Sequence, residues 1–335
     1  MRSSNINILV LGAGSWGTAL AVHLAKNNSV YLWGHDKQHI TQLCKERENK
    51  QFLPNVKIPD EINCISSINS FPQDENSLVL IVVPSFAFAE VTALLKNNNW
   101  PVNLGIAWAT KGLDLNRKIF LHQVVAESFG DKIPMAVLSG PTFASEVAIN
   151  LPTAITIAGN DQNHINRWIT SLTSPTFRCY ANHDIIGVEI AAATKNIIAI
   201  AAGVSDGLGY GANARSAIIT RGLQEIMRLG KAFGAQQKTF FGLAGLGDLS
   251  LTCSDDKSRN RRLGLLLAQN LTLEQAKKQI KQTIEGALAS KTIQSIAQEK
   301  NIEMPITNAV VDLLEGKITP KQAAVNLLTR KIIFE

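Results

Sequence analysis

The sequence has few cysteines and no pattern that would use them together. Four cysteines occur in 335 residues, with no C-x-x-C pair and no histidine cluster of matching spacing. A secreted disulfide framework or a structural zinc site would require such a pattern, so we expect no metal site. The first apolar run is also too short for a signal peptide, because Asn7 interrupts it and a glycine-rich segment follows at once.

An uninterrupted hydrophobic run long enough to cross a membrane is missing as well. The best candidate, residues 185–204, approaches the roughly 20 residues that a bilayer requires. It contains Glu189 and Lys195, however. Each ionised group near the bilayer centre costs about 2.5–3.5 kcal/mol even on lenient scales. We therefore expect a buried helix, in a protein without a transmembrane segment.

Acidic residues are outnumbered by basic ones, but the imbalance is modest. The formal net charge is +6 and the isoelectric point about 9.1. A nucleic-acid binder and an enzyme for phosphorylated ligands would both show such values. Hydrophobic residues make up 45% of the chain, which is ordinary for a globular protein with a packed core. The length favours about two domains.

Short apolar runs alternate with helical patterns in the first half of the chain. Runs of strand length occur at residues 6–11, 30–33, 78–83, 105–109, 135–139 and 153–158, and helical patterns at 17–26, 85–95 and 116–128. Strands that alternate with helices indicate βαβ units and a parallel sheet. The predicted fold class is therefore α/β, with a Rossmann-type, mainly parallel-sheet domain over residues 1–187.

Strand-like runs disappear after about residue 185. Apolar residues then recur at intervals of three and four, the spacing of a helix face. The segments with this pattern are 188–202, 214–233, 261–269, 273–281, 287–298 and 320–329. Thr272 and Thr319 precede two of them as candidate N-caps, the latter followed by proline. We expect an all-α C-terminal domain over residues 188–335, with no Pro/Gly/Ser-rich linker before it.

A glycine-rich turn follows the first predicted strand. Gly12, Gly14 and Gly17 form a G-x-G-x-x-G motif, with Ser15 and Trp16 between them, and a helical pattern follows. The motif alone is weak, but this strand and helix are the context that dinucleotide binding requires. The glycines permit the turn, the approach of the pyrophosphate and close helix packing, and the helix N-terminus binds phosphate. The alternative is a plain β–α turn.

The end of the second predicted strand carries a mixed cofactor signal. NAD enzymes usually place an acid there for the ribose 2′-hydroxyl. This sequence has Trp33 and Gly34 at that point, and Asp36 comes slightly late. His35 could approach a 2′-phosphate instead, or it is a solvated loop residue. The cofactor prediction is NADP or NAD, with NADP slightly favoured.

Lys195 lies inside the most apolar helical run, in line with apolar neighbours. Most helical lysines are solvated. A buried ammonium, by contrast, has a lowered pKa that suits general acid–base catalysis near neutral pH. We interpret Lys195 as the candidate catalytic residue, which Asp248 and Asn196 hold in place.

Three further segments carry candidate ligand-binding residues. Lys111 and the pair Gly140–Thr142 each follow a predicted strand, at the sheet edge where α/β proteins bind ligands, although both segments could be surface turns. Residues 242–249 are glycine-rich and include Asp248. Residues 258–262 read SRNRR before a helical run, which makes a phosphate site, a solvated basic surface or a nucleic-acid patch. No aromatic residues that would stack bases lie nearby, so we expect no nucleic acid.

Taken together, these segments resemble the bacterial NAD(P)-dependent glycerol-3-phosphate dehydrogenase family. The motifs span nearly the whole chain: GAGSWGTALA (12–21), ATKGL (109–113), LSGPTFASEV (138–147), ATKNIIAIAAG (193–203), GLAGLGDLSLTC (242–253), SRNRRLG (258–264) and IEGA (284–287). The resemblance implies a cytoplasmic enzyme that interconverts glycerol 3-phosphate and dihydroxyacetone phosphate for phospholipid synthesis.

The resemblance also implies roles for individual residues. Lys195 would exchange the proton. Cofactor binding would fall to Ser15, Trp16, His35, Lys111, Ala144, Arg259, Thr283 and Glu285, alongside the glycines of the turn. Substrate binding would fall to Lys111, Gly140, Thr142, Lys195, Asp248, Ser258, Arg259 and Asn260.

Two other functions fit parts of the sequence. A β-hydroxyacid or 6-phosphogluconate-type dehydrogenase also places a lysine on a helical second domain. A silent NAD(P)-binding sensor would bind cofactor but have no use for a buried lysine. The sequence leaves the oligomeric state open, a homodimer being one option.

Overall fold

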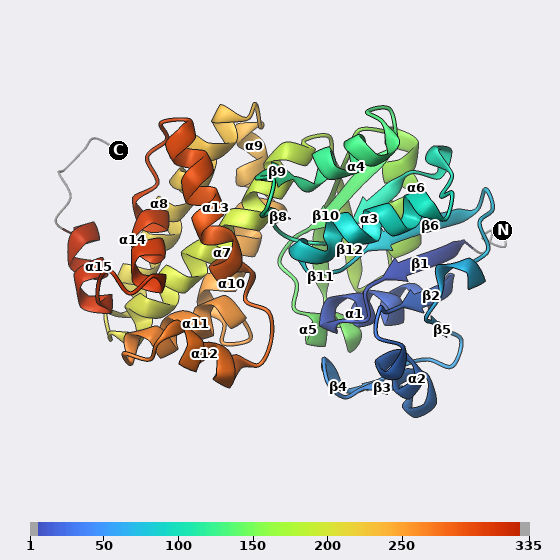
Figure 1. Ribbon diagram of the computed structural model, residues 1–335, viewed down its shortest axis with the longest axis horizontal. Helices are drawn as coiled ribbons and strands as arrows, with labels where there is room; N and C mark the ends of the chain where they lie inside the picture. The colour runs from blue at the N-terminus through green and yellow to red at the C-terminus, as the bar shows by residue number, and fades with distance from the viewer. Residues whose placement is uncertain (1–5, 329–335) are drawn as a thin grey trace. The chain divides into compact units, whose positions relative to one another are not determined.

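The computed structural model describes residues 6–328 and divides into two compact units. The first comprises the chain up to Asp114 together with Ile119–Ile185, and the second comprises Leu115–Lys118 together with the chain from Ile186 onward. The first unit holds the described strands, and the second is helical (Figure 1).

An eight-stranded sheet forms the first unit, in the order β12-β11-β10-β7-β6-β1-β2-β5. All neighbours pair in parallel except β10 and β11. The predicted mainly parallel Rossmann-type sheet is therefore confirmed. The strands are β1 (Asn7–Leu11), β2 (Ser29–Trp33), β5 (Asn63–Ile65), β6 (Ser77–Ile81), β7 (Ile106–Trp108), β10 (Met135–Ser139), β11 (Thr153–Gly159) and β12 (Phe177–Asn182).

The sheet changes direction of winding at β1. From β1 the chain proceeds to β2 on one side, and later to β6 on the other side, both parallel to β1. Such a switch point opens a crevice at the carboxyl ends of the strands, where α/β folds bind ligands. Gly12, Gly34, Lys111 and Gly140 all follow carboxyl ends at this edge.

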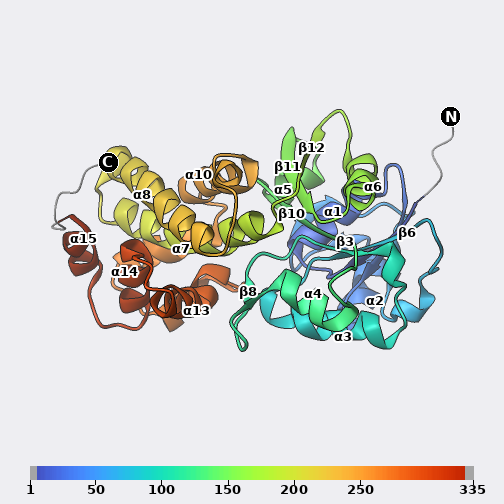
Figure 2. The same cartoon turned by 90° about the horizontal axis from the view of Figure 1, so that it is seen from above.

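Helices connect the strands, and the sequence predicted three of the six, α1, α3 and α4. Helix α1 packs against α5 and α6, and α3 packs against α4 (Figures 1 and 2). Helices α2, α5 and α6 were not predicted, because their polar surfaces obscure the apolar spacing. The helices are α1 (Ser15–Leu24), α2 (Lys37–Glu46), α3 (Phe88–Asn97), α4 (Leu121–Phe129), α5 (Ala144–Ala148) and α6 (Gln162–Leu172), with 3₁₀ turns at Ile68–Ser70, Ser85–Ala87 and Val102–Leu104.

Two short hairpins complete the first unit: β3 (Glu48–Asn49) with β4 (Leu53–Lys57), and β8 (Leu113–Asp114) with β9 (Ile119–Phe120). The second hairpin corrects the helix expected at 116–128, which begins only at Leu121. Its tip belongs to the second unit because Lys118 Nζ donates to Ser295 Oγ at 2.7 Å and to Glu299 Oε1 at 2.8 Å.

The second unit contains helices alone among its described residues, which confirms the all-α prediction. Thr272 and Thr319 cap α12 and α15 as predicted, each in a reciprocal pair with a glutamine three residues later. The helices are α7 (Ile185–Gly207), α8 (Gly211–Ala232), α9 (Gln237–Phe240), α10 (Asp248–Ser254), α11 (Arg259–Ala268), α12 (Leu273–Ile280), α13 (Glu285–Glu299), α14 (Pro305–Leu314) and α15 (Pro320–Leu328), with a π-helical turn at Leu243–Gly247.

Helix α7 runs through the interior of the helical unit (Figure 2). It is long and apolar enough to cross a membrane by length and composition, but 94% of its most hydrophobic window is buried inside the protein. Glycines bring α11 close to it: a Cβ on Gly203 would lie 2.1 Å from the Arg261 carbonyl oxygen, and one on Gly264 would lie 2.1 Å from the Ile200 carbonyl oxygen. The backbones of α7 and α11 are therefore in direct contact where the two helices cross.

Candidate functional site

The glycine turn joins β1 to α1 and packs against the end of β6. Gly12 has a φ of +127°, and a Cβ there would lie 2.4 Å from the Val82 carbonyl oxygen. A Cβ on Gly17 would lie 1.8 Å from the Gly12 carbonyl oxygen. Packing within the protein therefore accounts for both glycines.

Gly14 differs from the other two glycines. A Cβ at this position would meet nothing within 4 Å, so the fold itself does not demand glycine there. Gly14 is also the N-cap of α1, and no side chain caps this helix end. Uncapped amides at a helix N-terminus beside open space suit a phosphate group. The turn therefore fits the pyrophosphate of a dinucleotide.

Alanine substitutions should separate these two kinds of glycine. Gly17→Ala is expected to lower the free energy of unfolding by about 2–4 kcal/mol, because backbone must move to admit the methyl group. Gly14→Ala should leave the melting temperature close to that of the unmodified protein, yet weaken NADPH binding about tenfold. Thermal melts and a fluorescence titration with NADPH measure both effects. Equal losses of stability in the two variants would contradict the distinction.

The loop after β2 holds His35, which is exposed, and Asp36. Asp36 Oδ1 caps α2 by accepting from the backbone amides of Gln38 at 2.9 Å and His39 at 3.1 Å. The hydrogen bond from the His39 amide is the main cause that holds the pKa of Asp36 below its usual value. Asp36 therefore acts as the N-cap of α2. This role explains why it lies three residues after the end of β2 and not directly at the strand end.

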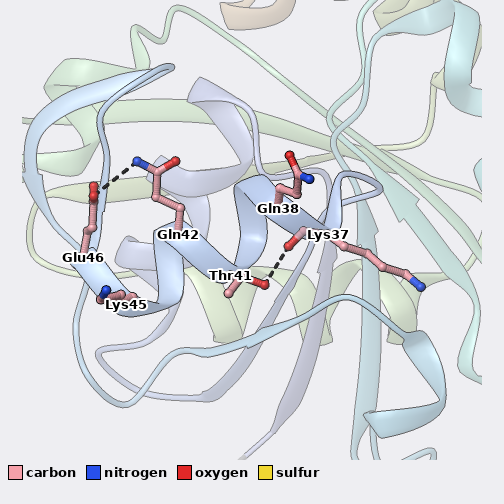
Figure 3. A pocket seen from close by; sticks show the side chains of 6 residues that line it. All are labelled: Lys37, Gln38, Thr41, Gln42, Lys45 and Glu46. Atoms are coloured by element: carbon pink, nitrogen blue, oxygen red, sulfur yellow. Dashed lines mark hydrogen bonds between the residues drawn. The ribbon is translucent and has the colours of Figure 1, made fainter.

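A shallow pocket lies on the exposed side of α2 (Figure 3). Gln42 Nε2 donates to Glu46 Oε1 at 3.2 Å, and Thr41 Oγ1 donates to the Lys37 carbonyl oxygen at 2.7 Å. None of the residues predicted for the site lines it. The lining residues are Lys37, Gln38, Thr41, Gln42, Lys45 and Glu46.

The other predicted residues of the first unit follow β7 and β10. Thr110 Oγ1 donates to the Val83 carbonyl oxygen at 2.8 Å, which fixes the segment before Lys111 to the end of β6. Gly140 approaches β11 closely, since a Cβ there would lie 2.9 Å from Ile155 Cα. Thr142 Oγ1 donates to the Gly140 carbonyl oxygen at 3.2 Å, and Ala144 begins α5.

In the second unit, Lys195 is 4% exposed and forms an ion pair with Asp248, which is 1% exposed. The Lys195 Nζ to Asp248 Oδ1 distance is 2.5 Å. Burial alone disfavours an ammonium group, but an adjacent carboxylate favours it. The Asp248 carboxylate therefore counteracts the effect of burial on Lys195, and the expected contact with Asp248 is present.

Thr252 is the residue that the sequence reading missed. Its Oγ1 accepts from Lys195 Nζ at 2.7 Å and donates to the Asp248 carbonyl oxygen at 2.6 Å. Its position four residues after Asp248 on α10 was the available signal, because such residues share a helix face. Asn196, expected beside the lysine, instead accepts from Asn260 Nδ2 at 2.9 Å.

The glycine-rich segment before Asp248 forms the π-helical turn Leu243–Gly247. A Cβ on Gly245 would lie 2.1 Å from the Phe240 carbonyl oxygen, so the close backbone approach occurs within the helical unit itself. Such turns are frequent at functional sites. Asp248 directly follows this turn and is the first residue of α10, where the helix dipole favours a carboxylate.

The SRN segment begins α11. Ser258 is the N-cap, and its Oγ accepts from the Arg261 amide at 3.2 Å. Arg259 follows in the first turn and donates no hydrogen bond to another described residue. Burial lowers the pKa of Arg259, whereas the charge of Glu285 raises it. An arginine retains its charge under these influences, so the start of α11 presents a guanidinium group.

Asn260 links three segments of this unit. Its Nδ2 donates to Asn196 Oδ1, and its Oδ1 accepts from the Gly286 amide at 2.9 Å. A Cβ on Gly286 would lie 2.6 Å from the Asn196 carbonyl oxygen. The asparagine therefore fixes the first turn of α13, which begins at Glu285, against the helix of the lysine. Thr283 lies in the segment before α13.

Comparison with known proteins matches this arrangement to one family over most of the chain. The family models described as NAD-dependent glycerol-3-phosphate dehydrogenase N-terminus and C-terminus match residues 7–165 and 184–325. The chain belongs to this family. The predicted resemblance is confirmed.

Individual members of the family are similar over nearly their full length. Proteins of Shigella boydii and Escherichia coli named glycerol-3-phosphate dehydrogenase (NAD(P)+) are 46% identical over 98% of this chain and 97% of their own. A crystal structure of the glycerol-3-phosphate dehydrogenase of Coxiella burnetii has a TM-score of 0.93 at 45% identity, covering 97% of this chain and 99% of that one. D-Mandelate dehydrogenase, at 13% identity and a TM-score of 0.60, shares the fold alone.

Proposed function

We propose that this member of the glycerol-3-phosphate dehydrogenase family reversibly converts dihydroxyacetone phosphate and NAD(P)H to sn-glycerol 3-phosphate and NAD(P)+. The observation that carries the proposal is the buried Lys195–Asp248 pair in a chain of this family. A charged amine inside an apolar helix is costly to bury. Its presence is understandable where a carbonyl oxygen must be protonated.

The residues of the first unit would hold the cofactor, which, when bound, exchanges a hydride with C2 of the substrate. The uncapped amides after Gly14 would bind its pyrophosphate. The proposed cofactor-binding residues are Gly12, Gly14, Ser15, Trp16, Gly17, His35, Lys111 and Ala144 here, and Arg259, Thr283 and Glu285 in the second unit.

Lys195 would donate its proton to the carbonyl oxygen during reduction and take it back during oxidation. Its ammonium group would stabilise negative charge that develops on that oxygen. Asp248 and Thr252 bind Nζ and so hold the ammonium group in place.

The substrate phosphate would bind at the start of α11, remote from the reacting carbon, so that its binding energy orients the carbonyl group. Arg259 supplies the charge. Lys111, Gly140, Thr142, Asp248, Ser258 and Asn260 complete the proposed substrate-binding set.

Cofactor preference is a separate part of the proposal, with NADP favoured over NAD. Asp36, the acid nearest the end of β2, comes late in the sequence and uses Oδ1 to cap α2, so it is less suited to a ribose 2′-hydroxyl than an acid at the strand end. We expect the KM for NADPH to be about tenfold lower than that for NADH. His35→Ala should raise the KM for NADPH and leave that for NADH unchanged. A lower KM for NADH in the unmodified protein would contradict this preference.

We further propose a cytoplasmic enzyme that supplies glycerol 3-phosphate for phospholipid synthesis and acts as a homodimer. The deciding assay follows NAD(P)H absorbance with purified protein and dihydroxyacetone phosphate, against 3-hydroxyisobutyrate and 6-phosphogluconate with NADP+. Turnover of either acid but not of the triose would support a rival dehydrogenase. Tight cofactor binding without any turnover would support a sensor.

A further inference from the structure

Asn49 is a buried polar residue that none of the motifs above includes. It lies in β3, outside the glycine turn, and is 1% exposed. Its carboxamide makes four hydrogen bonds. Nδ2 donates to the Ala13 carbonyl oxygen at 2.9 Å and to Thr18 Oγ1 at 2.8 Å. Oδ1 accepts from His39 Nε2 at 3.1 Å and from the Phe52 amide at 3.3 Å.

These four bonds use the full capacity of a carboxamide, which has two N–H donors and two lone pairs on oxygen. The partners come from the glycine turn, α1, α2 and the turn between β3 and β4. A buried polar side chain that is fully bonded rigidifies its surroundings, whereas a missing partner costs free energy. Asn49 therefore fixes the relative positions of these segments.

The bond to Ala13 also sets the orientation of a peptide group in the glycine turn. A trans peptide places its carbonyl and amide on opposite sides. With the Ala13 carbonyl directed at Asn49, the Gly14 amide is directed away from it. Gly14 is the glycine beside open space. The buried carboxamide thus aims a backbone donor at the position that suits a phosphate.

The bond to His39 connects the same carboxamide to the loop at His35, where the adenosine ribose of the cofactor is expected. His39 lies in the first turn of α2, and its amide is bound by the cap Asp36, which directly follows His35. His39 also packs edge-on against Phe52, with ring centroids 5.3 Å apart. Asn49 therefore spans from the phosphate turn to the loop expected at the adenosine ribose.

We propose that Asn49 is a positioning residue for the dinucleotide, which sets the spacing between the phosphate-binding turn and the loop at His35. The proposal rests on the proposed function only in that the ligand is a nicotinamide dinucleotide. Asn49 itself touches protein groups and acts through Ala13 and His39.

The test uses Asn49→Asp, which keeps size and both acceptor roles but places a carboxylate against the Ala13 carbonyl oxygen. Asn160→Asp is the control, at an exposed asparagine whose carboxamide also bonds backbone groups on both sides. Asn160 Nδ2 donates to the Ile133 carbonyl oxygen at 2.9 Å and its Oδ1 accepts from the Met135 amide, in the same unit but away from the turn. Fluorescence titration measures the Kd of NADPH and of NADH, and thermal melts measure stability.

We expect Asn49→Asp to raise the Kd of the preferred cofactor about 30-fold, and Asn160→Asp to change it less than twofold. At saturating cofactor, the KM for dihydroxyacetone phosphate should not change in Asn49→Asp. Cofactor affinity within threefold of the unmodified protein, or an equal loss in Asn160→Asp, would overturn the proposal.

Thr18→Val provides a second, milder variant in case Asn49→Asp does not fold. It removes one acceptor of Asn49 and keeps the shape of the side chain. A Kd raised about fivefold would support the proposal, and an unchanged Kd would contradict it. Because cofactor binding is measured directly, an unmodified protein that binds NADPH but does not turn over the triose would contradict the proposed reaction without affecting this test.

Discussion

Replacing Lys195 by alanine is expected to lower kcat for dihydroxyacetone phosphate reduction by on the order of 10³-fold. In the proposed reaction, the substitution removes both the proton donor and the positive charge that would stabilise the carbonyl oxygen. Neither Asp248 nor Thr252 can supply the lost positive charge, and the hydroxyl of Thr252 is a far weaker acid than an ammonium group. Steady-state kinetics with saturating NADPH measure the loss, and a fluorescence titration should show that the Kd for NADPH is retained.

A control is needed because Lys195→Ala leaves Asp248 buried without its partner. Breaking a buried ion pair from one side costs about 3–5 kcal/mol, whereas neutral replacement of both partners is often tolerated. We therefore expect the double variant Lys195→Met, Asp248→Asn to melt at a higher temperature than Lys195→Ala and to remain equally inactive. Turnover within tenfold of the unmodified protein in either variant would exclude Lys195 as the proton donor.

The elements predicted correctly from the sequence are those whose pattern reflects burial. The run 135–139 corresponds to β10, Met135–Ser139, because a strand covered on both faces carries apolar residues without alternation. Strand β12, Phe177–Asn182, was not predicted because it lies at the sheet edge, where only Phe177 is fully buried. Apolar patterns therefore predicted the interior of the sheet and not this edge.

The helix expected at 116–128 failed for a reason that local sequence does not contain. Lys118 has a φ of +55°, which a helix excludes. Its side chain binds Glu299, 181 residues later in the chain. The positive φ of Lys118 and its contact with a distant helix are not visible in local sequence, whereas the amphipathic pattern of the segment correctly predicted the helix that begins at Leu121.

The residues of the candidate site also differ in whether the sequence could predict them. Lys195 and Asp248 could be predicted because a charge in an apolar helix and an acid after a glycine-rich segment are visible in the sequence. The roles of Asp36 and Asn49 could not be predicted. An aspartate after a strand is equally compatible with a helix cap and with a ribose ligand. The four partners of Asn49 come from segments between 3 and 36 residues away.

Replacing Arg259 by alanine is expected to lower kcat/KM for dihydroxyacetone phosphate by on the order of 10²-fold, and to leave kcat/KM for unphosphorylated dihydroxyacetone within about threefold. The guanidinium group is a charged side chain at the start of α11, where Ser258 caps the helix and Arg261 is already paired with Asp206. Kinetics with both substrates, at saturating NADPH, measure the difference.

Two further variants show whether the fork of the guanidinium group matters rather than its charge alone. Arg259→Lys should recover only part of the loss, because an ammonium cannot bind two phosphate oxygens side by side. Arg228→Ala removes an exposed arginine from α8 of the same unit, where it donates to the Glu303 carbonyl oxygen, and should leave both substrates unaffected. Inorganic phosphate should compete with the triose phosphate in the unmodified protein and not in Arg259→Ala. Equal losses on the phosphorylated and unphosphorylated ketones would assign Arg259 to the cofactor and remove it from the phosphate site.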